Sequence, residues 1–369
     1  MKNTLTKLMR TLALASISAA LSLPLTAKDE DYDLIIDELV IPWGMVQLPD
    51  GSFLVTEREG KLFHIDVKNK KRMEISGLPA ISQRNQGGLL DLELHPDYAK
   101  NGWLYMSMVT VGDKSEGEGD HTTIARAKLS GNKLTDFEIL YKGTPNGKRP
   151  YHYGSRLEFD NEGYLYFTIG DRGERDVNPQ DINRDGGKVY RIHDDGRIPK
   201  SNPFVSGKKP AIFSYGHRNP QGMAKNPWSG DIWVHEHGPK GGDEINISKP
   251  AKNYGWPIIS YGINYNGTVF TEITEKEGME QPILHWTPSI APSGMTFVTS
   301  DKYPKWKGHL LAGSLKFGYL VLVKLDGDKV VGQEIVYEGI GRTRNIRQMP
   351  DGYIYVAVDG EGIKQLTPQ

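Results

Sequence analysis

Short apolar segments alternate with polar turns along most of the chain, and one pattern recurs six times. Each instance has an apolar strand, a turn rich in Pro, Asp, Asn and Gly, and a second strand in which apolar and polar residues alternate. This composition and alternation predict β-hairpins. The six predicted hairpins are VQLPDGSFLVTE (46–57), LELHPDYAKNGWLYMSM (92–108), LEFDNEGYLYFTIG (157–170), MAKNPWSGDIWVHE (223–236), MTFVTSDKYPKWKGHLLAG (295–313) and IRQMPDGYIYVAVD (346–359).

The spacing of the hairpins predicts how they are assembled. The turns lie roughly 50 to 70 residues apart, which fits one four-stranded sheet per repeat. Six repeats predict an all-β fold, a six-bladed β-propeller of four-stranded antiparallel sheets, in which radial packing leaves few strand edges exposed. A pair of β-sandwich domains is the alternative, although no segment reads as an interdomain linker. Long insertions are expected at 110–122, 171–188 and 237–292, where loops on one face of a propeller would build a site.

The first 27 residues have the pattern of a secretory signal peptide. A basic start precedes the mostly apolar segment 11–25, and Leu25-Thr26-Ala27 matches a cleavage site. A membrane anchor is the alternative, but the apolar segment is shorter than the ~20 residues that a span needs, and no stable membrane insertion is expected. We therefore expect residues 28–369 to form a single propeller domain of a periplasmic or secreted protein.

Charge and cysteine content narrow the function classes. The net charge is −1 with both signs interspersed, so no basic stripe points to nucleic acid. The chain has no Cys and no HExxH, which disfavours a zinc site. It also has no Walker loop and no GxGxxG opening a helix, so neither nucleoside triphosphate nor nicotinamide chemistry is supported.

The third hairpin is flanked by a candidate base and a candidate carboxylate. His152 lies in RPYHYGSRLEFD just before the hairpin, and Asp171 ends it in TIGDRGER. Imidazole has a pKa near neutrality, which suits a general base, and a carboxylate beside it orients the ring. Taken singly, each residue could also be an ordinary surface His or turn Asp. The spacing allows one strand pair to bring them together.

Cations recur at the ends of later hairpins. Arg218 and Asn219 precede Pro220, and Lys316, Arg342 and Arg344 follow in AGSLKFG and GRTRNIR. Arg342 and Arg344 alternate, so they share one face of an extended segment. Cations that converge from different blades would suit a polyanionic small molecule. The other interpretation is solvated surface charge.

The segment EHGPKGGDEIN (236–246) offers hard oxygen donors. Asp243, Glu244 and the carbonyls of Gly238-Pro239 are the kinds of ligand that Ca²⁺ takes. His235 and His237 alternate on one strand and offer weaker evidence for a transition metal. Structural roles for those two His are the more ordinary expectation.

At these residues the chain resembles a known family. It is similar to the soluble, pyrroloquinoline-quinone-dependent (PQQ-dependent) glucose/sorbosone dehydrogenases, and most of all to their periplasmic aldose sugar dehydrogenase branch. Motifs across nearly all of the chain after the leader carry the resemblance. They are QGGLLDLELHPDY (86–98), SYGHRNPQGMAKNPWSG (214–230), EHGPKGGDEINISKPAKNYGWP (236–257), YGINYNG (261–267), PSIAPSGM (288–295) and RTRNIRQMPDGYIYV (342–356).

The resemblance implies a propeller and assigns roles to residues. His152 would be the base, Asp171 its acidic neighbour, and Arg218 would stabilise negative charge on the quinone. The carbonyls of Gly238 and Pro239 would bind the calcium that contacts the cofactor. A second, structural calcium would be held by Glu244 and the Tyr254 backbone. The residues implied to hold the cofactor are Gln86, Arg218, Asn219, Tyr265, Lys316, Arg342 and Arg344.

The implied reaction is oxidation of an aldose sugar at its anomeric carbon to a lactone. Electrons would then pass to an external acceptor, a quinone or a periplasmic redox protein, because the sequence shows no haem or Fe–S attachment motif. Two departures from the family pattern leave the identity of the sugar substrate undetermined. Tyr151 stands where the glucose-specific branch is usually acidic, and Ser155 stands where the aldose branch often has Gly. The resemblance implies that both positions lie beside the substrate pocket.

Two other functions fit the same fold. A calcium-dependent lactonase-type hydrolase would need several carboxylates and Asn around one central metal. A non-catalytic propeller binding module would leave His152 and the cation set without a purpose.

Overall fold

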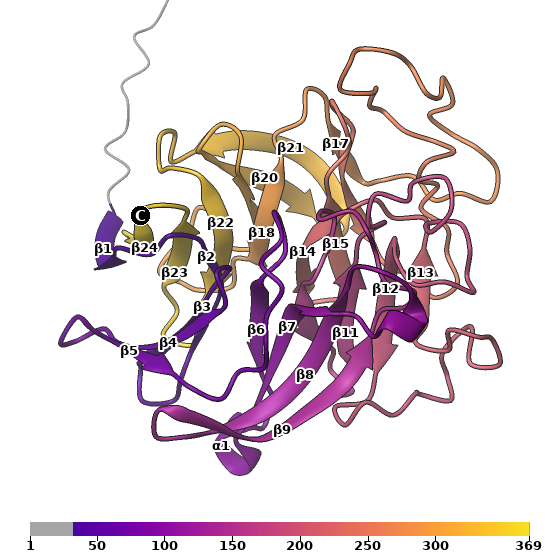
Figure 1. Cartoon of the computed structure of the whole chain (residues 1–369). Coiled ribbons are helices and arrows are strands. Elements are labelled where there is room, and N and C mark those ends of the chain that lie inside the picture. The colour runs from indigo at the N-terminus through magenta and orange to yellow at the C-terminus, as the bar shows by residue number, and fades with distance from the viewer. Residues whose placement is uncertain (1–31, 369) are drawn as a thin grey trace, which may run out of the picture.

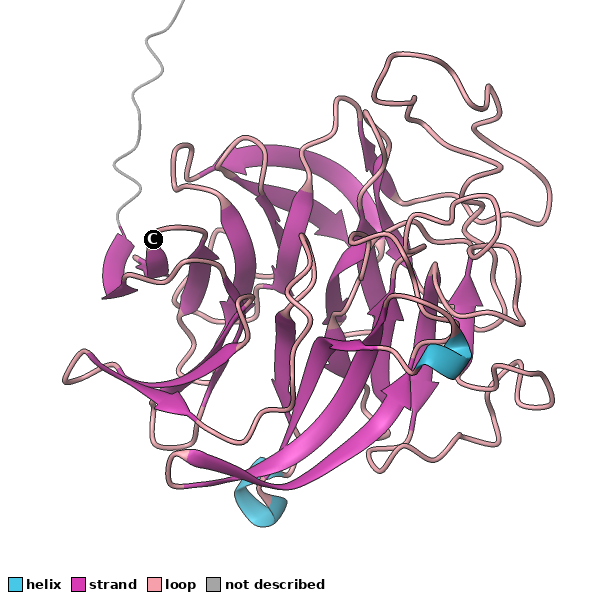
Figure 2. Ribbon diagram, in the orientation of Figure 1, coloured by secondary structure: helices cyan, strands magenta, loops and turns pink. Residues whose placement is uncertain are grey.

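Residues 32–368 are described by a computed structural model of the chain. They form 24 strands, one short α-helix (α1, Tyr98–Asn101) and one 3-10 helix (η1, Lys114–Glu116) (Figure 2). The strands make six four-stranded antiparallel sheets, so the fold is a six-bladed β-propeller, as the repeats predict, and not two β-sandwiches (Figure 1). The predicted signal peptide, residues 1–27, lies outside the described residues.

Five blades are each built from four consecutive strands, ordered from the centre outward. Blade 1 is β2 (Pro42–Gln47), β3 (Phe53–Glu57), β4 (Lys61–Asp66) and β5 (Lys71–Ile75). Blade 2 is β6 (Leu89–Leu94), β7 (Trp103–Val111), β8 (Asp120–Ser130) and β9 (Lys133–Lys142). Blade 3 is β10 (Leu157–Phe159), β11 (Leu165–Ile169), β12 (Lys188–Ile192) and β13 (Ile212–Tyr215). Blade 4 is β14 (Pro220–Lys225), β15 (Ile232–Glu236), β16 (Asp243–Ile247) and β17 (Leu284–Trp286). Blade 5 is β18 (Pro292–Phe297), β19 (Leu310–Ser314), β20 (Leu320–Asp326) and β21 (Lys329–Val336).

Blade 6 combines the two ends of the described chain. It consists of β22 (Thr343–Gln348), β23 (Ile354–Val358), β24 (Gly362–Leu366) and, outermost, β1 (Tyr32–Asp37). β1 pairs antiparallel with β24, from Tyr32 opposite Leu366 to Asp37 opposite Gly362 (Figure 1). The ring is therefore closed by hydrogen bonds between segments more than 300 residues apart, which the six hairpins alone do not reveal.

Each predicted hairpin coincides with the first two strands of a blade, because its turn chemistry is local. In the turn of blade 1, for example, the Asp50 carboxylate accepts a 3.0 Å hydrogen bond from the Ser52 amide. Gly51 has φ 85°, a conformation that favours glycine. The expectation of one long insertion at 237–292 is wrong in part, because β16 and β17 interrupt it. The segment between those strands forms the long orange loop in Figure 1.

Apolar side chains fill the spaces between neighbouring blades. The cluster between blades 5 and 6 has 14 buried residues, whereas the cluster between blades 3 and 4 has six. Polar and charged side chains, including His217, Glu236 and Asn246, are buried beside that smaller cluster. The interface between blades 3 and 4 therefore contains buried polar side chains beside a small apolar cluster.

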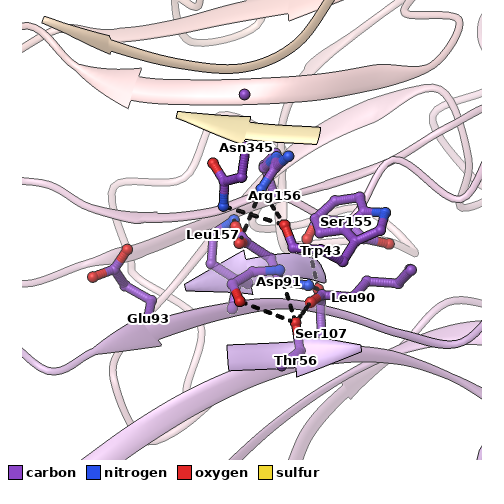
Figure 3. Close-up of polar contacts among 12 residues, drawn as sticks. Trp43, Thr56, Leu90, Asp91, Glu93, Ser107, Ser155, Arg156, Leu157 and Asn345 are labelled. Atoms are coloured by element: carbon purple, nitrogen blue, oxygen red, sulfur yellow. Dashed lines mark hydrogen bonds and ion pairs between the residues drawn. The ribbon is translucent and has the colours of Figure 1, made fainter. Parts of the chain in front are cut away.

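The centre of the ring is filled by one buried arginine and its partners (Figure 3). The guanidinium of Arg156 donates to the carbonyls of Gln221 at 2.6 Å, Arg344 at 2.8 Å and Trp43 at 3.4 Å. It also pairs with Asp91 at 3.1 Å and lies 4.0 Å from the centre of the Trp43 ring. These contacts join the inner strands of five blades, so the channel is closed by a polar network instead of an apolar plug.

Candidate active site

The predicted site residues gather on one face of the propeller. Inner strands begin on this face and second strands end on it, because neighbouring strands are antiparallel. Gln86, His152, Arg218, Asn219 and Arg342 lie in loops that lead into inner strands, and Arg344 lies within β22 near its start. The residues that follow second strands are Asp171, Gly238, Pro239 and Lys316.

His152 and Asp171 form a hydrogen-bonded pair. The Nδ1 atom of His152 lies 2.7 Å from Oδ1 of Asp171, and the side chains are 14% and 1% exposed. The backbone of His152 has φ 58°, which is uncommon for a residue with a side chain, and its amide donates to Oε1 of Gln86 at 2.9 Å. No hydrogen bond to Nε2 occurs among residues 32–368, so that nitrogen is free to accept a proton.

Further hydrogen bonds hold the Asp171 carboxylate and its backbone. Its Oδ2 accepts from Nε1 of Trp256 at 2.9 Å, and its Oδ1 accepts from the Gly173 amide at 2.7 Å. Its own amide donates to the carbonyl of Arg218 at 2.7 Å. Trp256 was not singled out by the sequence analysis, although it lies within the family motif 236–257. Only the long loop between β16 and β17 brings it to this face.

Asp171 and His152 differ in charge state at neutral pH, because the pKa of each is lowered. Burial and the nearby Arg218 lower the pKa of His152, although Asp171 opposes that shift. Burial tends to raise the pKa of Asp171, but His152 and Arg218 outweigh it, so that pKa is lowered. At neutral pH the carboxylate is therefore ionised and the imidazole is neutral, as a base requires.

Arg218 is buried beside this pair and is 5% exposed. Its Nη1 donates to the carbonyls of His237 and Gly238, each at 2.9 Å, and its guanidinium lies 5.3 Å from the Trp256 ring centre. A fixed cation is therefore aimed into the same space as His152.

One cavity of about 570 Å³ joins these groups. Six of the predicted site residues line it: Gln86, His152, Asp171, Arg218, Pro239 and Tyr265. Tyr151 and Trp256 also line it, and the Tyr151 ring packs against His152 with centroids 4.8 Å apart. Tyr265 is 71% exposed and marks the rim. Ser155 is buried away from the cavity with φ 86°, which corrects the expectation that it borders the substrate.

Lys316, Arg342 and Arg344 form a second group that does not line this cavity. Arg342 and Arg344 donate to Oδ2 of Asp359 at 3.1 and 2.8 Å, so they do share one face. The Nη1 of Arg342 also donates to the carbonyl of Leu315 at 2.7 Å, which places it beside Lys316. Three cations against one carboxylate leave this group with surplus positive charge.

Asn219 carries a buried donor that lacks a partner. The residue is 1% exposed, and its Oδ1 accepts from the Gly154 amide at 3.1 Å. Its Nδ2 has no hydrogen-bond partner in the structure. Buried polar groups are seldom left unpaired, so this atom is suited to an acceptor oxygen of a bound molecule.

The acidic pair Asp243 and Glu244 divides into two roles. The Asp243 carboxylate is saturated by hydrogen bonds from the Gly238, Ile290 and Ala291 amides and from the Ser289 hydroxyl. It closes the loop that carries Gly238-Pro239 and is not available to a metal. This corrects the expectation that both acids are free oxygen donors.

Glu244 faces the polar interface between blades 3 and 4. Burial and the neighbouring Glu236 raise the pKa of Glu244 to about 8. The Nδ2 of Asn246 donates to the Glu244 carboxylate at 3.0 Å. The Oδ1 of Asn246 is buried without a hydrogen-bond partner. Two carboxylates and an unpaired carbonyl oxygen are suited to a hard cation. Tyr254, the other predicted ligand, is buried in the same interface with its ring stacked 4.5 Å from His217.

Neither His235 nor His237 is placed as a metal ligand. The Nε2 atoms of His235 and His237 contact the carbonyls of Gly294 at 3.2 Å and Pro292 at 2.6 Å. Among residues 32–368, no group of three or more His, Cys, Asp or Glu is arranged to hold a metal ion. Any calcium would therefore depend on main-chain and amide oxygens for much of its coordination.

Comparison with known proteins places the chain in a family. Residues 39–366 match the glucose/sorbosone dehydrogenase family model. The chain is 41% identical to the aldose sugar dehydrogenase YliI of Escherichia coli over 337 residues, covering 89% of this chain and 90% of that protein. It is 28% identical to quinoprotein glucose dehydrogenase B of Acinetobacter calcoaceticus over 446 residues, covering 96% and 92%.

Solved structures agree with the family match. The apo-form of the soluble aldose sugar dehydrogenase of Escherichia coli superposes with a TM-score of 0.87 at 39% identity, covering 92% of this chain and 99% of that one. The PQQ-bound aldose sugar dehydrogenase of Streptomyces coelicolor superposes with a TM-score of 0.74 at 27% identity, covering 91% and 96%. The chain belongs to the glucose/sorbosone dehydrogenase family.

Proposed function

We propose that this protein is a PQQ- and calcium-dependent aldose sugar dehydrogenase that oxidises the anomeric carbon of an aldose to a lactone. The observation that carries the proposal is the His152–Asp171 pair, which opens with Arg218 into one cavity. The relatives named as aldose sugar dehydrogenases support it, as does the PQQ-bound form of one of them.

His152 would act on the sugar as the base. Its Nδ1 is held by Asp171 at 2.7 Å, which leaves Nε2 to take the proton of the anomeric hydroxyl. Asp171 stabilises the imidazolium that forms, and general base catalysis of this kind is worth about 10² to 10⁴ in rate. When bound, the quinone supplies the two-electron acceptor for the hydride that leaves the anomeric carbon.

Arg218 would stabilise negative charge that develops in the cavity. Its guanidinium is buried and fixed by two carbonyls, so it needs little reorganisation as the reaction proceeds. The cofactor would be held by Gln86, Asn219 and Tyr265 around the cavity. Lys316, Arg342 and Arg344 would attract its carboxylates with their surplus charge.

Calcium would be bound at two places. Pro239 lines the cavity, and the carbonyls of Gly238 and Pro239 would hold the ion that meets the cofactor. Glu244 and the Tyr254 backbone would hold a structural ion between blades 3 and 4. The unpaired Oδ1 of Asn246 supports an ion at the second place.

The alternative functions fit the residues less well. A lactonase-type hydrolase needs a metal at the centre of the ring, but the guanidinium of Arg156 occupies that position. A binding module gives no reason for a buried His–Asp pair in a cavity. The electron acceptor would be a quinone or a periplasmic redox protein, which suits export by the predicted signal peptide at 1–27. No helix among residues 32–368 is long and apolar enough to span a bilayer.

Reconstitution tests the proposal. Purified apoprotein would be mixed with PQQ and Ca²⁺ and assayed with a panel of aldoses and an artificial dye acceptor. We expect cofactor binding and sugar-dependent dye reduction in the wild type. The His152→Ala variant should bind cofactor and lose turnover. A wild type that neither binds PQQ nor reduces dye with any sugar would refute the proposal.

A further inference from the structure

The backbone around His152 requires something to hold it. His152 has φ 58°, and a non-glycine residue in this region stores local strain that the surroundings must compensate. Its ring is held by Asp171, but the ring contact does not fix the loop that carries it. That loop runs from β9 to β10 and contains no regular structure beyond an isolated bridge at Gly147.

Arg172, the residue after Asp171, holds this loop on both sides of His152. Its Nη2 donates to the carbonyl of Arg149 at 2.9 Å, and its Nε donates to the carbonyl of Tyr151 at 3.4 Å. Its guanidinium lies 3.7 Å from the centre of the Tyr153 ring. Its amide donates to the carbonyl of His152 itself at 3.3 Å. One residue therefore contacts every position from 151 to 153.

Asp120 at the start of β8 completes the arrangement. Its Oδ1 accepts from Nη2 of Arg172 at 2.8 Å and from the Tyr153 hydroxyl at 3.0 Å. Its Oδ2 accepts from the Ser82 hydroxyl at 3.0 Å and pairs with Arg84 at 3.4 Å. Ser82 and Arg84 belong to the loop that carries Gln86, whose Oε1 accepts from the His152 amide. Asp120 thus anchors both loops that meet at His152.

The burial of this pair points to a role beyond stability. The Arg172 and Asp120 side chains are 6% and 2% exposed. A buried ion pair often adds little net stability compared with apolar side chains of the same volume. Tyr153, which contacts both residues, belongs to an apolar cluster with Trp43 and Leu90. What apolar side chains could not supply are donors for the carbonyls that flank His152.

We propose that Arg172 and Asp120 are positioning residues, which act through the 149–153 loop to place the ring of His152 against Asp171 and the cavity. The inference rests on the proposed function only for its effect on turnover. Its structural content, that the ion pair sets the His152–Asp171 contact, stands whether or not the protein oxidises a sugar.

The variants Arg172→Gln and Asp120→Asn test this idea. Each removes one charge, and Asp120→Asn does so with little change of volume. The affinity for PQQ should change less than kcat, because neither residue contacts a predicted cofactor residue directly. We expect kcat to fall about 100-fold, the scale of a displacement of about 1 Å in a reacting group, with KM changed much less. The double variant should lose little more than either single variant, since the two residues act as one unit.

The matched control is Arg347→Gln. Arg347 forms a partly buried ion pair with Glu93 at the opposite end of the central channel, with side chains 18% and 16% exposed. It should lower thermal stability by a comparable amount and leave kcat unchanged. If Arg172→Gln behaves as this control does, with lowered stability and unchanged kcat, the positioning role is wrong.

A measurement on the apoprotein separates this inference from the proposed function. The Nδ1–H of His152, hydrogen-bonded to Asp171, should give a low-field proton resonance in ¹H,¹⁵N spectra that His152→Ala removes. We expect Arg172→Gln and Asp120→Asn to shift or broaden that resonance and Arg347→Gln to preserve it. An unchanged resonance in both variants would overturn the inference even if no substrate is ever found. Should Arg172→Gln not fold, Asp120→Asn carries the same test.

Discussion

The indole nitrogen of Trp256 donates a 2.9 Å hydrogen bond to Oδ2 of Asp171, the oxygen opposite the one that holds His152. The two residues are 85 positions apart and come from different blades. A segment of the loop after β16 runs parallel to β13, with Tyr215 bridged to Asn253, and this delivers Trp256 to the site. Hydrogen bonds therefore link the loop that carries His152, the turn that carries Asp171 and the loop that carries Trp256, and together they orient the base.

Replacement of Trp256 by Phe should slow turnover without loss of the fold. The change keeps an aromatic ring against Arg218 and removes only the donor to Asp171. A hydrogen bond to a charged group is worth about 1.5–3 kcal/mol, and only part of it bears on the transition state, so we expect about a tenfold fall in kcat. Trp286→Phe is the control, because its indole donates to Gln333 at 2.9 Å away from the cavity. Equal kcat values for the two variants would contradict the role of Trp256.

The activity should depend on pH through His152. The base acts when neutral, and burial together with Arg218 lowers its pKa below the ordinary 6.5. The kcat/KM value should therefore be constant near neutral pH and fall with acid only below about 6.5. Asp171 raises the pKa of His152, so Asp171→Asn should move this acidic limb to still lower pH while also lowering the plateau. An acidic limb of the kcat/KM profile with an apparent pKa above 6.5 in the wild type would count against His152 as the base.

The unpaired donor of Asn219 predicts a specific effect on cofactor affinity. Asn219→Asp keeps the Oδ1 that accepts from Gly154 and replaces Nδ2 by an oxygen, which repels an acceptor. Losing such a contact costs about 1–3 kcal/mol, which is about 5- to 150-fold in the Kd for PQQ. Quenching of protein fluorescence on titration would measure it. Asn226→Asp, a buried asparagine in the turn between β14 and β15, should leave the Kd unchanged.

Calcium should stabilise the apoprotein through Glu244. An ion bound only to the folded state at 100 times its Kd adds about 2.7 kcal/mol, so the Tm should rise with Ca²⁺ and fall back on chelation. Glu244→Gln should weaken that response. Glu280→Gln is the control, because Glu280 forms a largely exposed pair with Lys252 in the loop that follows β16. An identical calcium response in wild type and Glu244→Gln would argue against Glu244 as a ligand.

Removal of the central arginine should destabilise the ring. Arg156→Met leaves the Asp91 carboxylate buried at the channel without its guanidinium, and breaking such a pair costs about 3–5 kcal/mol. Urea unfolding would report the loss. The Arg156→Met, Asp91→Leu double variant removes both charges and should recover part of the stability. If the double variant is less stable than Arg156→Met, the unpaired Asp91 carboxylate is not the cause of the lost stability.

Local sequence was sufficient to predict the six hairpins, whereas the class of chemistry came from the resemblance to a known family. Turn formation at Pro49-Asp50-Gly51 and the alternation in strands such as β23 depend on neighbours within a few residues, so they are visible in the sequence. For the same reason His152 and Asp171, at opposite ends of one hairpin, could be paired in advance. Cations such as Arg342 and Arg344 could be placed on one face because a strand has a period of two.

What the sequence could not determine depends on contacts between blades. The residue types alone did not distinguish Asp243, whose carboxylate is saturated by hydrogen bonds, from Glu244, which faces a polar interface; only the family resemblance assigned Glu244 to calcium. Nor did the sequence reveal that Trp256 reaches Asp171, that Arg156 fills the channel, or that β1 closes the ring. Each of these contacts joins residues far apart in the chain, and none has a local pattern. Ring closure brings such segments together, and burial then decides which polar groups are satisfied and which, like Nδ2 of Asn219, remain open to a ligand.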